Sequence, residues 1–150
     1  AVVATIGVGI GTYFARRRPA AVIPVEPTLE AARDLFTLRR EMLEAKFVSL
    51  ASQSGKPRGL TWVDCDFESR VAFARDRHTR QLRALVGVTI RFEATEGGGM
   101  EENPNVGNLR AATAVFRFEN GQWLTDGRAI FNLNPAEAIK HFQHELETAD

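Results

Sequence analysis

The apolar residues of this chain change their spacing at Ser54-Gly55-Lys56-Pro57, and this change constrains the fold more than any other feature. From Thr28 to this breaker they recur every three or four residues, which is typical of an amphipathic helix. From Leu60 onward, polar and apolar residues alternate, which is typical of strands with one buried face. The sequence therefore predicts an α+β domain in which a long helix packs on an antiparallel sheet.

The long helix has a recognisable start and a buried stripe. Thr28 is expected to be its N-cap, because Pro27 precedes it and Glu30 and Asp34 lie in the early turns, where acidic residues suit the helix dipole. The charged residues between the apolar positions are expected to face water. The predicted buried stripe is Leu29, Ala32, Leu35, Phe36, Met42, Leu43, Phe47 and Leu50.

Five strands are predicted after the breaker, and the closing pair is the best defined. Asn120-Gly121 is a strong hairpin signal, because a type I′ turn needs positive φ at both central residues. A two-residue loop fixes the register, so that Phe118 faces Trp123, Phe116 faces Thr125 and Ala112 faces Ala129. The predicted strands are Leu60–Phe67, Arg70–Asp76, Leu82–Ala94, Leu109–Glu119 and Gln122–Asn132.

This alternation gives the sheet an apolar face and a polar face. The long helix is expected to cross the apolar face of a strongly bent sheet, and Asn134-Pro135-Ala136-Glu137 is expected to open a short last helix with a buried stripe of Ile139, Phe142 and Leu146. Arginines beside aliphatic residues suit an interface. The candidate interface on the polar face is Arg91, Arg117, Leu124, Asp126, Arg128 and Ile130, with Val115 beside them.

The first eighteen residues predict a membrane anchor. Ala1–Ala15 carries no charge, ends in Tyr13 and Phe14, and is followed by Arg16, Arg17 and Arg18, which is how a membrane-spanning helix meets lipid headgroups. Fifteen helical residues cover about 22 Å of a hydrocarbon core about 30 Å thick, so further apolar residues are expected upstream. The alternatives are the tail of a signal peptide, which would carry its charges before the apolar run, and a buried helix, which three glycines disfavour.

The anchor predicts location and contacts. Gly7 and Gly11 form a small-xxx-small pair, which lets membrane helices approach closely. The Arg triplet favours a cytoplasmic position for the rest of the chain, and an upstream basic cluster would reverse that orientation. Residues 19–27 hold three prolines and are expected to form a stiff spacer. The predicted organisation is an anchor (1–18), a spacer (19–27) and one roll domain (28–150).

The order of elements and the closing hairpin, ATAVFRFENGQWLTDGRAIFN, resemble the cystatin-like roll and, within it, the nuclear transport factor 2-like superfamily. The resemblance covers roughly residues 28–150 and concerns the fold. It implies one of several functions, because the superfamily includes isomerases, dehydratases, transport factors and membrane-anchored docking modules. This chain has one clear leading helix, where the family usually has two or three.

Composition and motifs argue against several kinds of chemistry. The 19 basic and 19 acidic residues balance, whereas a general nucleic-acid binder needs excess positive charge. Asp64 would enter a pocket if Leu60 and Trp62 faced inward, although the wet face of a strand is the favoured interpretation for Asp64 and Asp66. The glycine-rich loop that begins at Glu96 is acidic and lacks Lys, so it is not a phosphate-binding loop.

The histidines and the cysteine also favour structural interpretations. His141 and His144 offer two metal ligands with no evident third, so an exposed helix face is favoured. Cys65 alternates with Val63 and Phe67 and is expected to be a small core residue. No catalytic residue, metal site or cofactor is predicted.

The sequence is therefore compatible with two functions. The first is a single-pass, membrane-anchored, non-catalytic accessory or scaffold domain that associates with other subunits of a membrane complex or with itself. The alternative is a small-molecule-binding or isomerase-type enzyme with a pocket in the roll. A closed aromatic interior favours the first, whereas a large cavity with a buried carboxylate favours the second.

Overall fold

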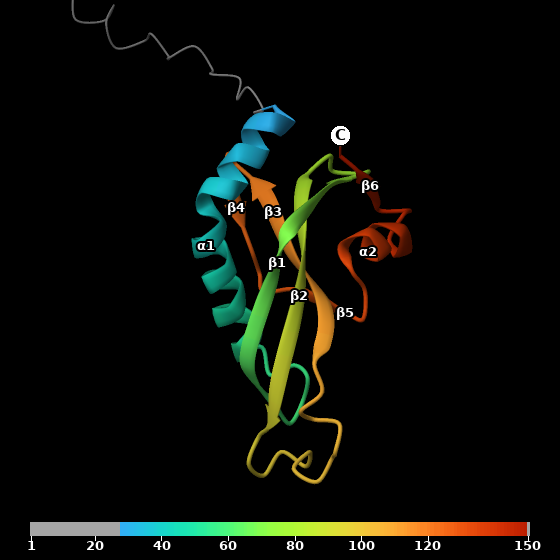
Figure 1. Ribbon diagram of the computed structural model, residues 1–150. Helices are drawn as coiled ribbons and strands as arrows, with labels where there is room; N and C mark the ends of the chain where they lie inside the picture. Colours follow the sequence, from blue (N-terminus) through green and yellow to red (C-terminus); the bar gives the residue numbers. More distant parts are fainter. Residues whose placement is uncertain (1–27, 150) are drawn as a thin grey trace, which may run out of the picture.

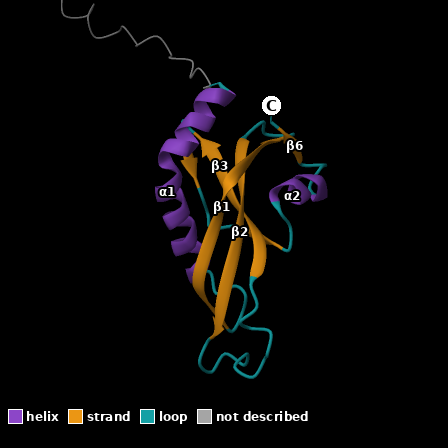
Figure 2. Cartoon of the chain, viewed as in Figure 1, coloured by secondary structure: helices purple, strands orange, loops and turns teal. Residues whose placement is uncertain are grey.

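The computed structural model describes residues 28–149 of the chain. Helix α1 (Leu29–Gln53) lies against one face of an antiparallel sheet and the short helix α2 (Pro135–His141) lies against the other, as Figures 1 and 2 show. The strand order is β4-β3-β2-β1-β6, with β5 also paired to β3, and the α+β prediction is confirmed. The strands are β1 (Leu60–Asp76), β2 (Leu82–Ala94), β3 (Arg110–Glu119), β4 (Gln122–Leu124), β5 (Ala129–Phe131) and β6 (Leu146–Thr148).

Helix α1 begins where the sequence predicts, because the Thr28 side chain accepts a hydrogen bond from the Ala31 amide at 3.2 Å. It ends before Ser54, whose amide donates to the Ala51 carbonyl. The buried stripe is narrower than predicted, since Met42 is 61% exposed. The residues of α1 that are buried against the sheet are Ala32, Phe36, Leu43, Phe47 and Ala51.

The prediction of two strands between Leu60 and Asp76 is wrong, because the segment forms the single 17-residue strand β1. Its register against β2 shifts between Phe67 and Val71, so the expected turn is a bulge. Strand β2 is long enough to pair with both halves of β1. The Arg40 guanidinium of α1 donates to the carbonyls of Glu68 and Ser69 and so satisfies backbone groups at the bulge.

The closing hairpin forms at Asn120-Gly121, with φ of 51° and 76°, and Phe118 pairs with Trp123 as predicted. The predicted strand Gln122–Asn132 is broken into β4 and β5, and the expected pairing of Phe116 with Thr125 lies beyond the β3–β4 ladder. Ala112 therefore pairs with Phe131, two residues later than predicted. A slip of two residues keeps every side chain on its expected face.

The break in this strand has a local cause at Thr125. The hydroxyl group of Thr125 donates to the Val115 carbonyl at 3.2 Å and accepts from the Gly127 amide at 3.0 Å. Gly127 has a φ of 77°, which turns the chain out of the extended conformation. Hairpin patterning alone does not reveal this side-chain hydrogen bonding.

Aromatic side chains fill the space between α1 and the sheet. Phe36, Phe47 and Phe116 are each at most 1% exposed, and the rings of Phe36 and Phe116 meet edge to face with centroids 5.4 Å apart. The ring of Trp123 meets Phe36 edge to face with centroids 5.1 Å apart, and its indole Nε1 donates to the Ala32 carbonyl at 2.8 Å. Trp123 thereby connects β4 to α1, so the interior is a packed core.

Helix α2 begins at a capping box formed by Asn134 and Glu137 and is shorter than predicted. It ends at His141, and Leu146 belongs to β6, which pairs with the end of β1. Ile139 of α2 packs on a small apolar cluster of Ala74, Leu85 and Val115. The face of the sheet opposite α1 is therefore partly covered.

The predicted anchor (1–18) and spacer (19–27) lie outside the described residues, as do Gly7, Gly11, Tyr13 and the Arg triplet. Within residues 28–149, no helix is both long and apolar enough to cross a membrane.

Candidate interaction surfaces

The outer face, which is the face of the sheet opposite α1, carries the arginine-rich candidate interface. Arg117 of β3, Asp126 and Arg128 come together around a hollow of about 150 Å³. Arg83 of β2 joins them because it pairs directly with Arg117 in the β2–β3 ladder. The sequence does not predict that Arg83 lies beside Arg117, because a long loop separates β2 from β3 and does not fix the register between them. Arg83, Arg117 and Arg128 are called the arginine cluster below.

Ion pairs hold most of this cluster in place. Arg117 Nη1 lies 2.5 Å from Asp126 Oδ2, and its Nε lies 3.1 Å from Glu119 Oε2. These hydrogen bonds, that to Asp126 first, raise the pKa of Arg117 above its ordinary value. Arg83 Nη2 lies 3.3 Å from Asp76 Oδ2. Because Arg117 and Arg83 are already paired, their side chains are fixed in position.

Two donors in the cluster have no carboxylate partner among residues 28–149. The guanidinium of Arg128 is exposed and lies 5.6 Å from the centre of the Phe142 ring, with no ion pair. The Nε of Arg83 is buried and makes no hydrogen bond within the described part of the chain. A buried donor without a partner is energetically unfavourable. A carboxylate in the hollow could bind the exposed guanidinium of Arg128 in a charge-assisted hydrogen bond.

The structure does not bring Arg91 to this cluster. Arg91 is on the outer face of β2, eight residues beyond Arg83, which corresponds to about 26 Å at roughly 3.3 Å per residue. Its Nε and Nη2 both donate to Asp64 Oδ2, at 2.9 and 2.7 Å, and this pairing raises the pKa of Arg91. Arg91 and Asp64 therefore form a separate surface ion pair.

The aliphatic part of the candidate interface is smaller than expected. Val115 is buried, Ile130 packs in the apolar cluster with Ile139 of α2, and Leu124 is half-buried. These aliphatic residues therefore do not share an exposed patch, since Val115 and Ile130 lie in the cluster that Ile139 of α2 joins. The outer face thus offers chiefly the arginine cluster.

The candidate chemical groups occupy structural positions. Asp64 and Asp66 are exposed, as the favoured interpretation held, because the register shift after Trp62 turns Cys65 toward the core instead. Burial, the largest cause, raises the pKa of the Cys65 thiol to about 12, so the thiol is protonated at neutral pH. His141 and His144 are exposed, and no group of three metal-ligating side chains occurs within residues 28–149.

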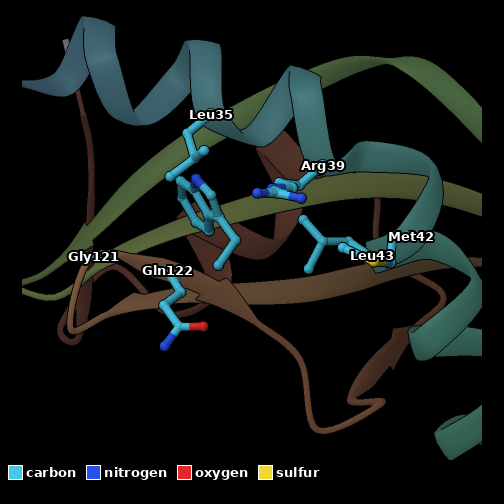
Figure 3. Close-up of a pocket in the computed structure, with 7 residues that line it drawn as sticks. Leu35, Arg39, Met42, Leu43, Gly121 and Gln122 are labelled. Atoms are coloured by element: carbon cyan, nitrogen blue, oxygen red, sulfur yellow. The ribbon is translucent and has the colours of Figure 1, made fainter.

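A second hollow, of about 350 Å³, lies between α1 and the β3–β4 turn (Figure 3). It lies at the surface beside Trp123, and no carboxylate lines it. Arg39 and Met42 of α1 extend along it, and Gln122 borders it from β4. The full lining is Leu35, Arg39, Met42, Leu43, Gly121, Gln122 and Trp123.

Comparison with models of protein families, with curated proteins and with solved structures finds no match to this chain. The function is therefore inferred from the residues and their geometry.

Proposed function

We propose that this chain is a membrane-anchored, non-catalytic accessory or scaffold domain, and a subunit of a membrane protein complex. The observation that carries this proposal is the filled interior. Phe36, Phe47, Phe116 and Trp123 are buried between α1 and the sheet, where an enzyme with the proposed roll would need a substrate pocket. The larger hollow lies outside this core and has no carboxylate in its lining, which supports docking over catalysis.

The long leading helix on an antiparallel sheet and the Asn120-Gly121 hairpin support the proposed kinship with the nuclear transport factor 2-like superfamily. Membrane-anchored members of that superfamily work as docking modules, and the uncharged run followed by the Arg triplet supports the same location here. In this proposal the anchor places the domain at a membrane, with the roll on the cytoplasmic side.

The location is tested by deleting Ala1–Arg18. The core of the domain lies within residues 28–149, so the shortened chain should fold and move from the membrane fraction to the soluble fraction. Fractionation and a thermal melt by circular dichroism measure the two properties. A shortened chain that unfolds would mean that the apolar segment belongs to the core, and one that stays with membranes would place the anchor elsewhere.

We propose the arginine cluster as the surface that docks a partner subunit through acidic side chains. Arg128 has no ion pair among the described residues, and the buried Nε of Arg83 has no hydrogen-bond partner there. Both residues line one hollow. Arginine binds carboxylates in two-point geometry, which favours a defined orientation of the partner. Binding through such groups should weaken as salt increases.

The docking test reverses two charges. The variant Arg117→Glu with Arg128→Glu should lose co-purifying subunits in mild detergent and keep its melting temperature within a few degrees. The matched control is Arg58→Glu with Arg70→Glu, since both side chains are exposed and make no ion pair within residues 28–149. If the same proteins co-purify with both double variants, the docking surface lies elsewhere, and the Gly97–Asn108 loop is the next region to test.

A further inference from the structure

Helix α1 presents a second apolar stripe beside the one that it buries: Leu35 is half-buried next to the core, and Leu38 and Met42 lie farther from the sheet. Leu38 is 76% exposed and Met42 is 61% exposed, although both are large apolar residues. They are two of the four such residues on the described surface, and they lie one helical turn apart. Figure 1 shows that α1 covers the sheet with one side and leaves its other side open.

The stripe has the spacing of a coiled-coil seam. Its residues follow each other at intervals of four, three, four and three, which is the heptad pattern of a and d positions. Leu35 and Met42 take the a positions. The two alanines and Leu38 take the d positions, and the seam extends about 21 Å along the helix. The seam residues are Ala31, Leu35, Leu38, Met42 and Ala45.

The charges beside this seam identify its partner. The g positions are Asp34 and Glu41. The e positions are Ala32, which is buried against the sheet, and the exposed Arg39 and Lys46. In a parallel pair of helices, each g residue faces the e residue five positions later in the partner. Asp34 would then face Arg39 of a second copy, and Glu41 would face Lys46. Both g residues are acidic and both charged e residues are basic, so these two cross pairs are attractive.

An antiparallel pair of the same helices is disfavoured by the same charges. That arrangement sets e against e and g against g, which brings together two basic or two acidic residues. All four side chains are exposed, and none makes an ion pair within residues 28–149. They are therefore available to a second molecule.

We propose that two copies of this chain pair in parallel through the α1 seam. The helix is already held in shape by its packing on the sheet, so association does not have to order it. The arginine cluster lies on the other face of the sheet and stays accessible in the pair. Parallel pairing also directs both chain starts the same way, which agrees with the proposed anchor but does not depend on it.

The first test is a cysteine cross-link in the full chain, in mild detergent, with Cys65→Ala as the background. In a parallel pair each d residue meets its own copy, so Leu38→Cys should form a disulfide-linked dimer under mild oxidation. The matched control is Thr37→Cys, an exposed neighbour on another side of α1, which should cross-link at least tenfold less.

The second test reverses the flanking charges and does not rely on oxidation. Variant A is Arg39→Glu with Lys46→Glu, and variant B is Asp34→Lys with Glu41→Lys. Each should weaken self-association at least tenfold in sedimentation, because its e and g residues now carry the same sign. A mixture of A and B should form a mixed dimer, since opposite charges face each other again.

The outcomes separate the possible occupants of the seam. Equal cross-linking at positions 37 and 38, or self-association unchanged in A and B, would overturn the proposal. A cross-link of Leu38→Cys to a protein of different mass, without self-association, would assign the seam to another partner. Failure of the docking test above would leave these measurements unaffected, because the arginine cluster shares no residue with the seam.

Discussion

Replacement of Trp123 by Phe should destabilise the domain by about 2–4 kcal/mol. The change removes the hydrogen bond from Nε1 to the Ala32 carbonyl, which contributes about 1 kcal/mol net. It also removes ring atoms packed against Phe36 and Phe118, whose centroids each lie 5.1 Å from the indole, and leaves a cavity that contributes the rest. At about 4 °C per kcal/mol for a domain of this size, the melting temperature should fall by about 8–16 °C.

Trp62 provides a matched control for this measurement. Its Nε1 also donates to a backbone carbonyl, that of Lys56 at 3.0 Å, but the bond is exposed and the side chain is only half-buried. Trp62→Phe makes the same chemical change and should lose at most about 1 kcal/mol. Urea denaturation followed by circular dichroism measures both variants. Equal losses would refute the reasoning, because they would mean that burial does not distinguish the two indoles.

Three further predictions follow from individual residues. Gly121→Val should destabilise the domain by about 1–2 kcal/mol through its φ of 76° alone, since an added Cβ would meet no atom within 4 Å; Gly121→Asn is the tolerated control, and an unchanged urea midpoint for Val would contradict the turn. The Cys65 thiol should react with a disulfide reagent at pH 8 far more slowly in the native protein than in urea, because its pKa is about 12 when folded, and equal rates would show that it is accessible. Backbone amides of Thr79 and His78 lower the pKa of Asp76, and Arg80 lowers the pKa of Glu147, so both carboxylates stabilise the folded state at pH values above their ordinary pKa and lose that contribution as the pH falls through the lowered pKa. The stability of Asp76→Asn should therefore fall less steeply than that of the parent below about pH 4 in an acid titration, and identical slopes would exclude this role.

Local signals predicted most of the elements in this fold. The Thr28 cap, the span of β2 and the Asn120-Gly121 turn depend on neighbours in sequence, and all three occur where they were predicted. The error at Glu68-Ser69 has a different origin, because a short polar segment is compatible with a turn or with a bulge. Pairing with β2 and the hydrogen bonds from Arg40 select the bulge.

The candidate surface was predicted in part for the same reason. Strand alternation identified Arg117, because the side of a strand on which a residue lies is a local property. Asp126 and Arg128 were also identified, although they lie in the break between β4 and β5. Strand alternation did not identify Arg83, since the register of β2 against β3 is set by packing across a long connecting loop. The heptad spacing is present in the sequence, but it can be assigned to an exposed seam only when the structure shows that α1 buries a different stripe.

By itself, the sequence determined the class of the fold, the caps, the hairpin turn and the alternation of faces, because these follow from backbone preferences and hydrophobic period over a few residues. Only the tertiary structure decided that α2 covers the aliphatic part of the outer face, that Arg83 joins Arg117, and that Leu38 and Met42 face solvent. These outcomes depend on which distant surfaces meet. The packing of the whole core determines which surfaces meet, and each local pattern specifies only one of the surfaces in a contact.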